Sequence, residues 1–518
     1  MLDLLIVLVY FTVIMFVALR GRRPEEETSV NAYFLSGNNL RWPSVAMSTI
    51  ATNIQGYQFL GMMGSAYLYG LAQANLEINA VQGILLAAFL FVPLYLSEKV
   101  ITITQFIERK AGRGVALAYS LANIVLFATV TLGAALFWGS FAAEQVFGEY
   151  FAFISADPLV RMGVIIVALG VFSAVYTYLG GLAAVVKTDI IQFAILVTGG
   201  VVVTLVAVHH LGGWGELYNK TPQLMHLHLP ADHPKLPWTL LFGLFFLNIN
   251  YWCANQSVVQ RSLAARNLRE AQIGLMVGGV TKYLMAVIII VPGIALYGIL
   301  QQQGGGLEDP DAAFPYLVDT YLPTGVKGVI LCALFASLMS TVDSTFNSLA
   351  TLFSVDVYKR YLRPKATEAE MVRAGRRTIL VALFTGVTMG LILMVVKFTD
   401  PQAAFTHVLN ELRYYVNCGI VVVILSVALL VAPVPRVTLV AFLASSVVYA
   451  GLKFAFPEMN YFVRAGLVIC SLFFLVQVPA AGFRFRPLRE WFTAEGAAVK
   501  WWGLGLAVSL VALHFVFH

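Results

Sequence analysis

Several ionisable and amide side chains of this 518-residue chain stand inside stretches that are otherwise apolar. An ionised group in the middle of a bilayer costs about 3 kcal/mol or more unless it has a partner or a water-filled cavity. Glu77 and Lys282 are the clearest cases, and the amides of Asn53, Gln58 and Asn248 accompany them. The two charges could simply pair with each other, or all five groups could line a cavity that hydrogen-bonds a neutral polyol. The number of amides favours the cavity.

Hydroxyl groups recur along the apolar stretch 325–352. They are spaced by three or four residues, which places them on one face of a helix: Ser337, Ser340, Thr341, Ser344 and Ser348. Oxygen ligands suit a hard cation such as sodium. The polar, glycine-containing run 52–58 predicts a broken helix whose carbonyls could complete such a site. Hydroxyls that bond back to their own helix are the structural alternative.

Carboxylates and aromatic side chains each leave two or more interpretations open. Asp343 lies among the hydroxyls, where it could be a cation ligand, a proton carrier or a partner of Arg413. Asp189 lies near the start of the apolar stretch 184–208, where a helix N-terminus would stabilise its charge as well as a functional site would. Tyr251 could be an ordinary core aromatic or a lid that stacks on a sugar ring.

The elements that carry these groups are membrane-spanning helices. Hydrophobic residues make up 59% of the chain and charged residues 12%, against about 25% charged in soluble proteins, which excludes an ordinary soluble enzyme. Continuous apolar runs, rather than alternating ones, predict helices and not barrel strands. We expect an all-α polytopic membrane protein with about fourteen spans, at 2–20, 43–70, 75–97, 115–147, 159–180, 184–208, 237–260, 270–300, 325–352, 375–398, 403–432, 437–455, 461–480 and 499–517.

Basic residues predict the orientation, because Lys and Arg accumulate in cytoplasmic loops. Most of the 33 Lys and Arg residues fall on the cytoplasmic side if both termini face outward. The basic residues form no patch on a soluble domain, so no nucleic-acid partner is expected. The chain contains no phosphate-cradling GxxxxGK[ST] motif, so uphill transport in the cell membrane would use a gradient.

A family resemblance adds to this interpretation. The chain closely resembles the sodium:solute symporters, within them the branch of bacterial sodium–galactose and animal sodium–glucose cotransporters. The motifs that carry the resemblance are Ala51-Thr52-Asn53-Ile54, Gln58-Phe59-Leu60-Gly61-Met62, Gly180-Gly181-Leu182 with Thr188-Asp189 and Gln192, the stretch from Asn248 to Gln260-Arg261, Ser340-Thr341, Phe346-Asn347-Ser348 and Asp356-Val357-Tyr358.

The resemblance implies a leucine-transporter-like fold of two inverted five-helix repeats. Residues 1–42 would be the first transmembrane helix and an inner loop, and residues 43–210 would be the first repeat, spans 2–6. Residues 211–432 would be the second repeat, spans 7–11, and residues 433–518 three C-terminal helices.

The resemblance also implies the binding residues. One sodium ion would be held by backbone oxygens of Ala51, Ile54 and Ser337 and by the hydroxyls of Ser340 and Thr341. A second cation, or a proton, would involve Asp189, Asp343 and Ser344. The implied sugar-binding residues, among which Tyr251 is an inner gate, are Asn53, Gln58, Met62, Glu77, Asn248, Tyr251, Lys282, Phe405 and Asn410. No cofactor is implied.

This chain departs from the family pattern at Leu76, Ala80 and Asn410, and it carries Arg413 where small residues are usual. The expected function is sodium-coupled symport of a sugar, with a hexose first, by alternating access. A sodium- or proton-coupled symporter for inositol or a sugar acid is the alternative. A membrane solute sensor would need a signalling domain that the sequence lacks, and an enzyme is not expected.

Overall fold

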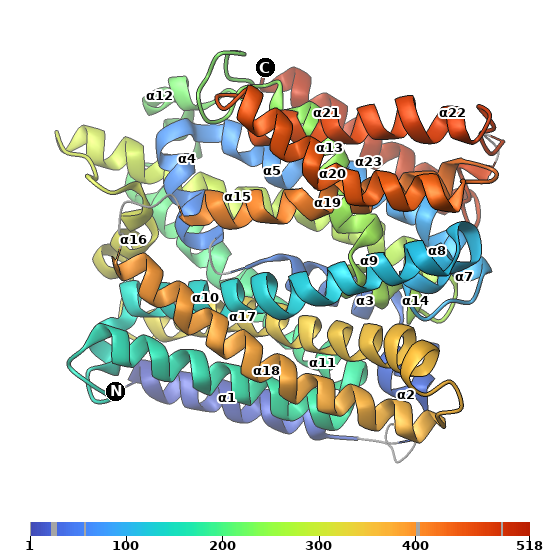
Figure 1. Cartoon of the computed structure of the whole chain (residues 1–518). Helices are drawn as coiled ribbons and strands as arrows, with labels where there is room; N and C mark the ends of the chain where they lie inside the picture. Colours follow the sequence, from blue (N-terminus) through green and yellow to red (C-terminus); the bar gives the residue numbers. More distant parts are fainter. Residues whose placement is uncertain (1, 22–27, 56–57, 400–404, 488–489) are drawn as a thin grey trace.

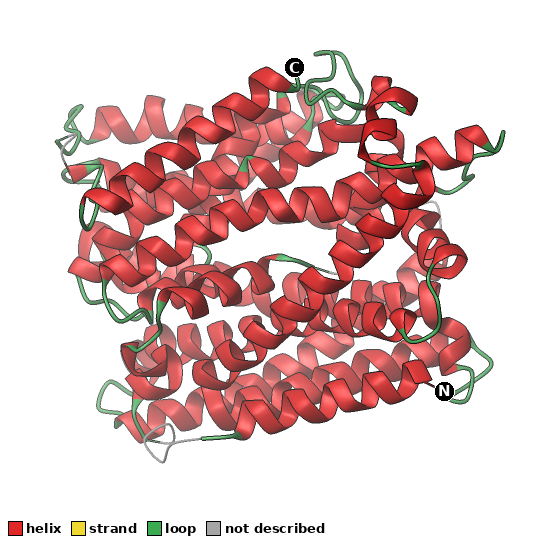
Figure 2. Cartoon of the chain, turned by 180° about the vertical axis from the view of Figure 1, so that it is seen from behind, coloured by secondary structure: helices red, strands yellow, loops and turns green. Residues whose placement is uncertain are grey.

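The computed structural model describes residues 2–21, 28–55, 58–399, 405–487 and 490–518, without the side chains of residues 405–410. Within these ranges the chain is helical and forms no strand, only isolated bridges such as the one between Leu40 and Ala265 (Figure 2). The predicted all-α class is therefore confirmed.

The helices follow one another with short connections. The first part of the chain forms α1 (Leu2–Leu19), α2 (Val30–Leu35), α3 (Trp42–Asn53), α4 (Met63–Tyr69), α5 (Asn75–Ile78), α6 (Ala80–Leu86), α7 (Val92–Ser97), α8 (Ile103–Ala111), α9 (Arg113–Leu126) and α10 (Leu132–Phe147). The middle forms α11 (Pro158–Leu211), α12 (Trp214–Lys220), α13 (Leu240–Ile249), α14 (Gln256–Leu263), α15 (Leu268–Gln302), α16 (Ala313–Tyr321) and α17 (Val326–Thr351). The last part forms α18 (Glu368–Thr399), α19 (Phe405–Leu429), α20 (Pro435–Ala455), α21 (Tyr461–Cys470), α22 (Val478–Ala480) and α23 (Ala497–Val516). Three π-helical segments are used below, namely η3 (Gln58–Met62), η9 (Asn250–Ala254) and η11 (Leu352–Leu362).

Eleven helical runs in the described part of the chain are long and apolar enough to cross a membrane. The difference from fourteen predicted segments has local causes. Segments 159–180 and 184–208 form the single 54-residue helix α11. The predicted segment 43–70 is interrupted, and its second half joins the predicted segment 75–97 in one helical run, Gln58–Ser97. The run Leu240–Ala254 is apolar but short.

Two helices are interrupted in the same way. The helix α3 ends at Asn53, and Ile54 takes an extended conformation with φ −85° and ψ 120°, so the predicted break in 52–58 is present. The run of α13 and η9 ends before Asn255, which has φ −85° and ψ 116° and caps α14. Each break exposes backbone groups that a continuous helix would use internally.

The helix α11 contains a third interruption, at Gly181, where φ is 52° and ψ −147°. Only glycine adopts this conformation readily, and an added Cβ would overlap the carbonyl oxygen of Tyr33. Asp189 lies two turns beyond this break, fully buried. A helix N-terminus acts mainly within its first turn, so the dipole explanation of Asp189 does not hold.

The helices pack in layers around α3 and α17. In Figure 1, α1, α11, α17 and α18 lie together on one side and α19, α20 and α21 on the other, with α3, α9 and α14 between. The helix α3 contacts α15, α11 and α17. The buried Asp3 of α1 accepts hydrogen bonds from the amides of Gly325 and Gly328, both 2.7 Å, and so fixes the start of α17.

Candidate functional site

A buried cluster of charges and amides lies beside the break of α3. Lys282 of α15 forms an ion pair with Glu77 of α5, and both side chains are almost fully buried. The Lys282 ammonium also donates to Asn53 Oδ1 at 2.6 Å. Gln58 Nε2 donates to the other oxygen of Glu77 at 2.7 Å. Four of the predicted sugar-binding residues therefore form one connected network.

The remaining predicted sugar-binding residues are not part of this network in the described part of the chain. Asn248 Nδ2 donates to the carbonyl oxygen of Asn79, 3.0 Å away, so α13 contacts the segment that carries Glu77. Met62 is buried at the end of η3. Tyr251 is half-buried in η9. The side chains of Phe405 and Asn410 lie outside the described part of the chain.

The predicted sodium ligands meet where α17 faces the end of α3. Ser340 Oγ lies 2.7 Å from the carbonyl oxygen of Ala51 and 3.1 Å from that of Ser337. Thr341 Oγ1 lies 3.3 Å from the carbonyl oxygens of Thr52 and Ser337. Carbonyls and hydroxyls are the ligands that a hard cation prefers. Ile54, the fifth predicted ligand, is the buried residue at the break itself.

The residues predicted for a second cation form a network with a guanidinium at its centre, and it meets the end of α3 where Ser344 Oγ lies 2.9 Å from Thr52 Oγ1. Arg261 of α14 contacts Ser344 and lies 3.3 Å from Asp189 Oδ2, and Ser48 also donates to Asp189. Asp343 accepts from Tyr176 Oη at 2.5 Å. Asp343 is thus held by a tyrosine, and Arg261 places a positive charge between the two helices that carry Asp189 and Ser344.

Sequence reasoning gave no role to Arg261, although the family motif includes it. A charged residue just after the polar stretch 248–256 could have been read as the partner of a buried carboxylate. Asn79, another polar residue within an apolar stretch, had no predicted role either. Its Oδ1 lies 3.1 Å from His514 Nε2 of α23, so the C-terminal helix contacts the wall of the charged cluster.

A cavity of about 100 Å³ lies beside the break of α3. Its wall includes Gln55, Tyr251 and Thr341 as well as Arg413 of α19. Drug-sized ligands usually occupy pockets of about 300–1,000 Å³, so this cavity is smaller than a typical ligand pocket.

Broken helices beside clusters of oxygen atoms and buried polar groups are typical of ion-coupled membrane transporters. The sequence model of the sodium:solute symporter family matches residues 33–432. The chain belongs to this family and is a sodium-coupled solute symporter, with sodium as its coupling ion. It is therefore a multi-pass protein of the cell membrane, and not an enzyme.

Individual proteins with similar sequences are sodium/glucose cotransporters. The chain is 34% identical over 408 residues to the sodium/glucose cotransporter of Vibrio parahaemolyticus, a match that covers 74% of this chain and 73% of that protein. It is 30% identical over 419 residues to sodium/glucose cotransporter 1 of Sus scrofa, which covers 74% of this chain. This match spans only 62% of the animal protein.

The fold is shared with a solved transporter. The substrate-bound, outward-open structure of a Na+-coupled sialic acid symporter superposes with a TM-score of 0.79, although the sequences are 18% identical. The superposition covers 94% of this chain and 99% of the other. The predicted leucine-transporter-like class is supported at the level of the fold.

Proposed function

We propose that the chain imports a sugar or a sugar-like polyol, most readily a hexose, together with sodium. The observation that carries the proposal is the network of Lys282, Glu77, Gln58 and Asn53. The network brings an ammonium, a carboxylate and two side-chain amides together. These groups can both donate hydrogen bonds to the hydroxyls of a neutral polyol and accept hydrogen bonds from them. The names of the relatives from Vibrio and Sus scrofa point to the same substrate class.

Coupling would follow from the position of α3. Ala51 near its end faces the hydroxyl of Ser340, and Asn53 two residues later contacts Lys282. Sodium bound between α3 and α17 would hold the break in one arrangement and so fix Asn53 for the substrate. If each ligand prefers that arrangement, each raises the affinity of the other by the same factor.

We further propose fourteen spans with both termini outside, arranged as two inverted repeats over 43–210 and 211–432. The paired interruptions support the repeats, because Ile54 and Asn255 have nearly the same backbone conformation in the first helix of each repeat. The single-cysteine accessibility of positions 213 and 365 would test the topology. We expect labelling from outside at the first position and not at the second.

One observation favours an acidic substrate as the second candidate. The side chain of Arg413 borders the small polar cavity together with Asn250 and Tyr251. A guanidinium matches the planar geometry of a carboxylate, so a hexuronate or another sugar acid would gain a charge-assisted hydrogen bond there. Coupling to a proton through Asp343 belongs to the same alternative.

A binding screen separates the candidates. Purified protein would be titrated with hexoses, inositols and hexuronates, in sodium and in choline, by isothermal calorimetry. The proposal expects hexose binding that needs sodium and is lost in Gln58→Ala. Binding of a hexuronate that is lost in Arg413→Gln, without hexose binding, would favour the alternative.

A further inference from the structure

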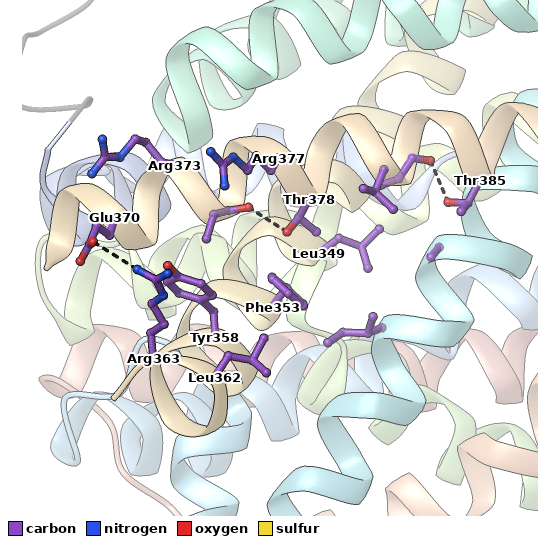
Figure 3. A pocket seen from close by; sticks show the side chains of 15 residues that line it. Leu349, Phe353, Tyr358, Leu362, Arg363, Glu370, Arg373, Arg377, Thr378 and Thr385 are labelled. Carbon is purple, nitrogen blue, oxygen red and sulfur yellow. Dashed lines mark hydrogen bonds and ion pairs between the residues drawn. The ribbon is translucent and has the colours of Figure 1, made fainter. Parts of the chain in front are cut away.

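A larger pocket lies between α9, α18 and the segment where α17 continues into η11 (Figure 3). Its volume is about 810 Å³. None of the proposed sodium or sugar ligands lines it, so the pocket is separate from the transport site. Its walls include Ile124, Ala128, Leu349, Phe353, Val381 and Thr385.

Arginines gather at one end of this pocket. Figure 3 shows Arg363, Arg373 and Arg377 with Glu370 at the same end. Glu370 lies 4.0 Å from Arg363. In the part of the chain that the structure describes, neither Arg373 nor Arg377 forms an ion pair, and both side chains are exposed. Three guanidinium groups against one carboxylate leave this end of the pocket positively charged.

The rest of the pocket is mainly apolar and extends along α18. Leu349 and Phe353 form one side, and Val381 and Ala382 the other. Twelve residues separate Arg373 from Thr385, a rise of about 18 Å along a helix. Half of the hydrocarbon core of a bilayer is about 15 Å thick. This length is close to the thickness of the hydrocarbon layer of one leaflet.

We propose that this pocket binds an anionic phospholipid of the cytoplasmic leaflet. The phosphate would lie between Arg363, Arg373 and Arg377, and an acyl chain would lie along Leu349, Phe353 and Val381. This leaflet follows from the topology proposed above, which puts the loop 353–374 inside. The charged end and the apolar length together select this ligand, since a soluble anion needs no apolar wall and a neutral lipid needs no arginines.

Charge around the pocket supports the same ligand. Residues 359–377 contain seven Lys and Arg residues against two Glu residues. Clusters of four to eight basic residues beside a membrane helix are typical of segments that bind anionic lipids. The pocket gives this general attraction a defined place, because Arg373 and Arg377 are one turn apart on the same face of α18.

Photo-crosslinking tests the proposal on the full-length protein. The protein would be reconstituted in phosphatidylcholine vesicles that contain phosphatidylglycerol with a diazirine in one acyl chain, and mass spectrometry would locate the crosslinks. We expect crosslinks in residues 349–363 and 373–385. The same diazirine chain on phosphatidylcholine should give far fewer crosslinks at these residues.

Variants sharpen the test. Replacing Arg373 and Arg377 by glutamine should reduce the crosslinks about fivefold for each arginine removed. The matched control Arg266→Gln with Arg269→Gln, also on the predicted inner side, should change nothing. Val381→Trp keeps the charge but fills the apolar end, and it should also reduce the crosslinks. A sodium-dependent thermal shift would show that each variant is folded.

Three results would overturn the proposal. They are equal crosslinking of the phosphatidylcholine probe, unchanged crosslinking in both the arginine and the tryptophan variants, and displacement of the probe by glycerol 3-phosphate, which has no acyl chain. The lipid measurement needs no substrate. It can therefore fail while sodium-dependent sugar binding succeeds, and the reverse.

Discussion

At the scale of single residues, the proposed sugar site depends on a buried ion pair that has two explanations. Lys282 and Glu77 neutralise each other in a place where either charge alone would be costly. They also present their remaining hydrogen-bonding capacity to Asn53 and Gln58. A structural pair and a binding pair have the same contacts, so variants that restore charge balance are needed to tell them apart.

We expect Lys282→Ala to destabilise the protein by about 3–5 kcal/mol, because it leaves the Glu77 carboxylate buried without a cation. The double variant Lys282→Met with Glu77→Gln removes both charges and should recover most of the thermal stability. It should not recover sugar binding, because the donors and acceptors have changed. Thermal unfolding in detergent and calorimetry would measure the two properties separately. If the double variant binds sugar as well as the native protein, the pair is only structural.

At the scale of helices, the interruptions of α3, α11 and α13 decide where the functional groups lie. The break in 52–58 could be predicted because polar residues and a glycine interrupt an apolar run. The interruption at Asn255 was not predicted, although its signal is local, because the Asn255 side chain accepts a hydrogen bond from the Ser257 amide and caps α14. The role of Arg261 was missed because its partner Asp189 is 72 residues away in sequence.

The left-handed conformation of Gly181 gives a direct test of the α11 break. We expect Gly181→Ala to lower the melting temperature clearly, because alanine in this sparsely populated backbone region costs about 1–3 kcal/mol and its Cβ would overlap the Tyr33 carbonyl. The matched control is Gly163→Ala in the same helix, where the new Cβ would lie 3.6 Å from a Leu391 methyl group, an ordinary contact. Equal melting temperatures of the two variants would contradict the assigned break.

A histidine contact between α23 and the loop before α13 predicts a pH dependence. His228 Nε2 lies 3.0 Å from His514 Nδ1, and the His518 ring is 5.2 Å from that of His228. Burial, and then the neighbouring His518, lower the pKa of His228 from its ordinary value of 6.5. The neutral form is therefore favoured when α23 is docked.

The docking of α23 should accordingly be strongest above about pH 6.5 and weaken as the pH falls through the lower pKa of the folded protein. Hydrogen–deuterium exchange of residues 497–518 should rise between pH 7.5 and 5.5 after correction for the intrinsic rate. The rise should be smaller in His228→Gln, in which only the His514 ring of the contact still titrates, and it should be retained in the control His209→Gln. A pH-independent exchange in the native protein would exclude this contact as the cause.

At the scale of the whole molecule, the two proposed sites share one helix, which is how an ion gradient could drive a solute. The membrane class, the helix positions and the groups of polar residues could be predicted from hydropathy and spacing. The contacts across long sequence distances could be expected only from the family resemblance, because hydropathy and spacing do not specify which helices meet. Ser340 and Ala51 are 289 residues apart, and only the packing of α17 on α3 brings them to 2.7 Å.

Sodium-dependent uptake into proteoliposomes tests the central claim most directly. An inward sodium gradient should drive accumulation of a labelled hexose at fixed pH, and replacement of sodium by choline should abolish it. The double variant Ser340→Ala with Thr341→Ala removes two proposed ligands and should shift half-maximal activation to a much higher sodium concentration. Accumulation that persists in choline, or an unchanged sodium dependence in the double variant, would contradict the account.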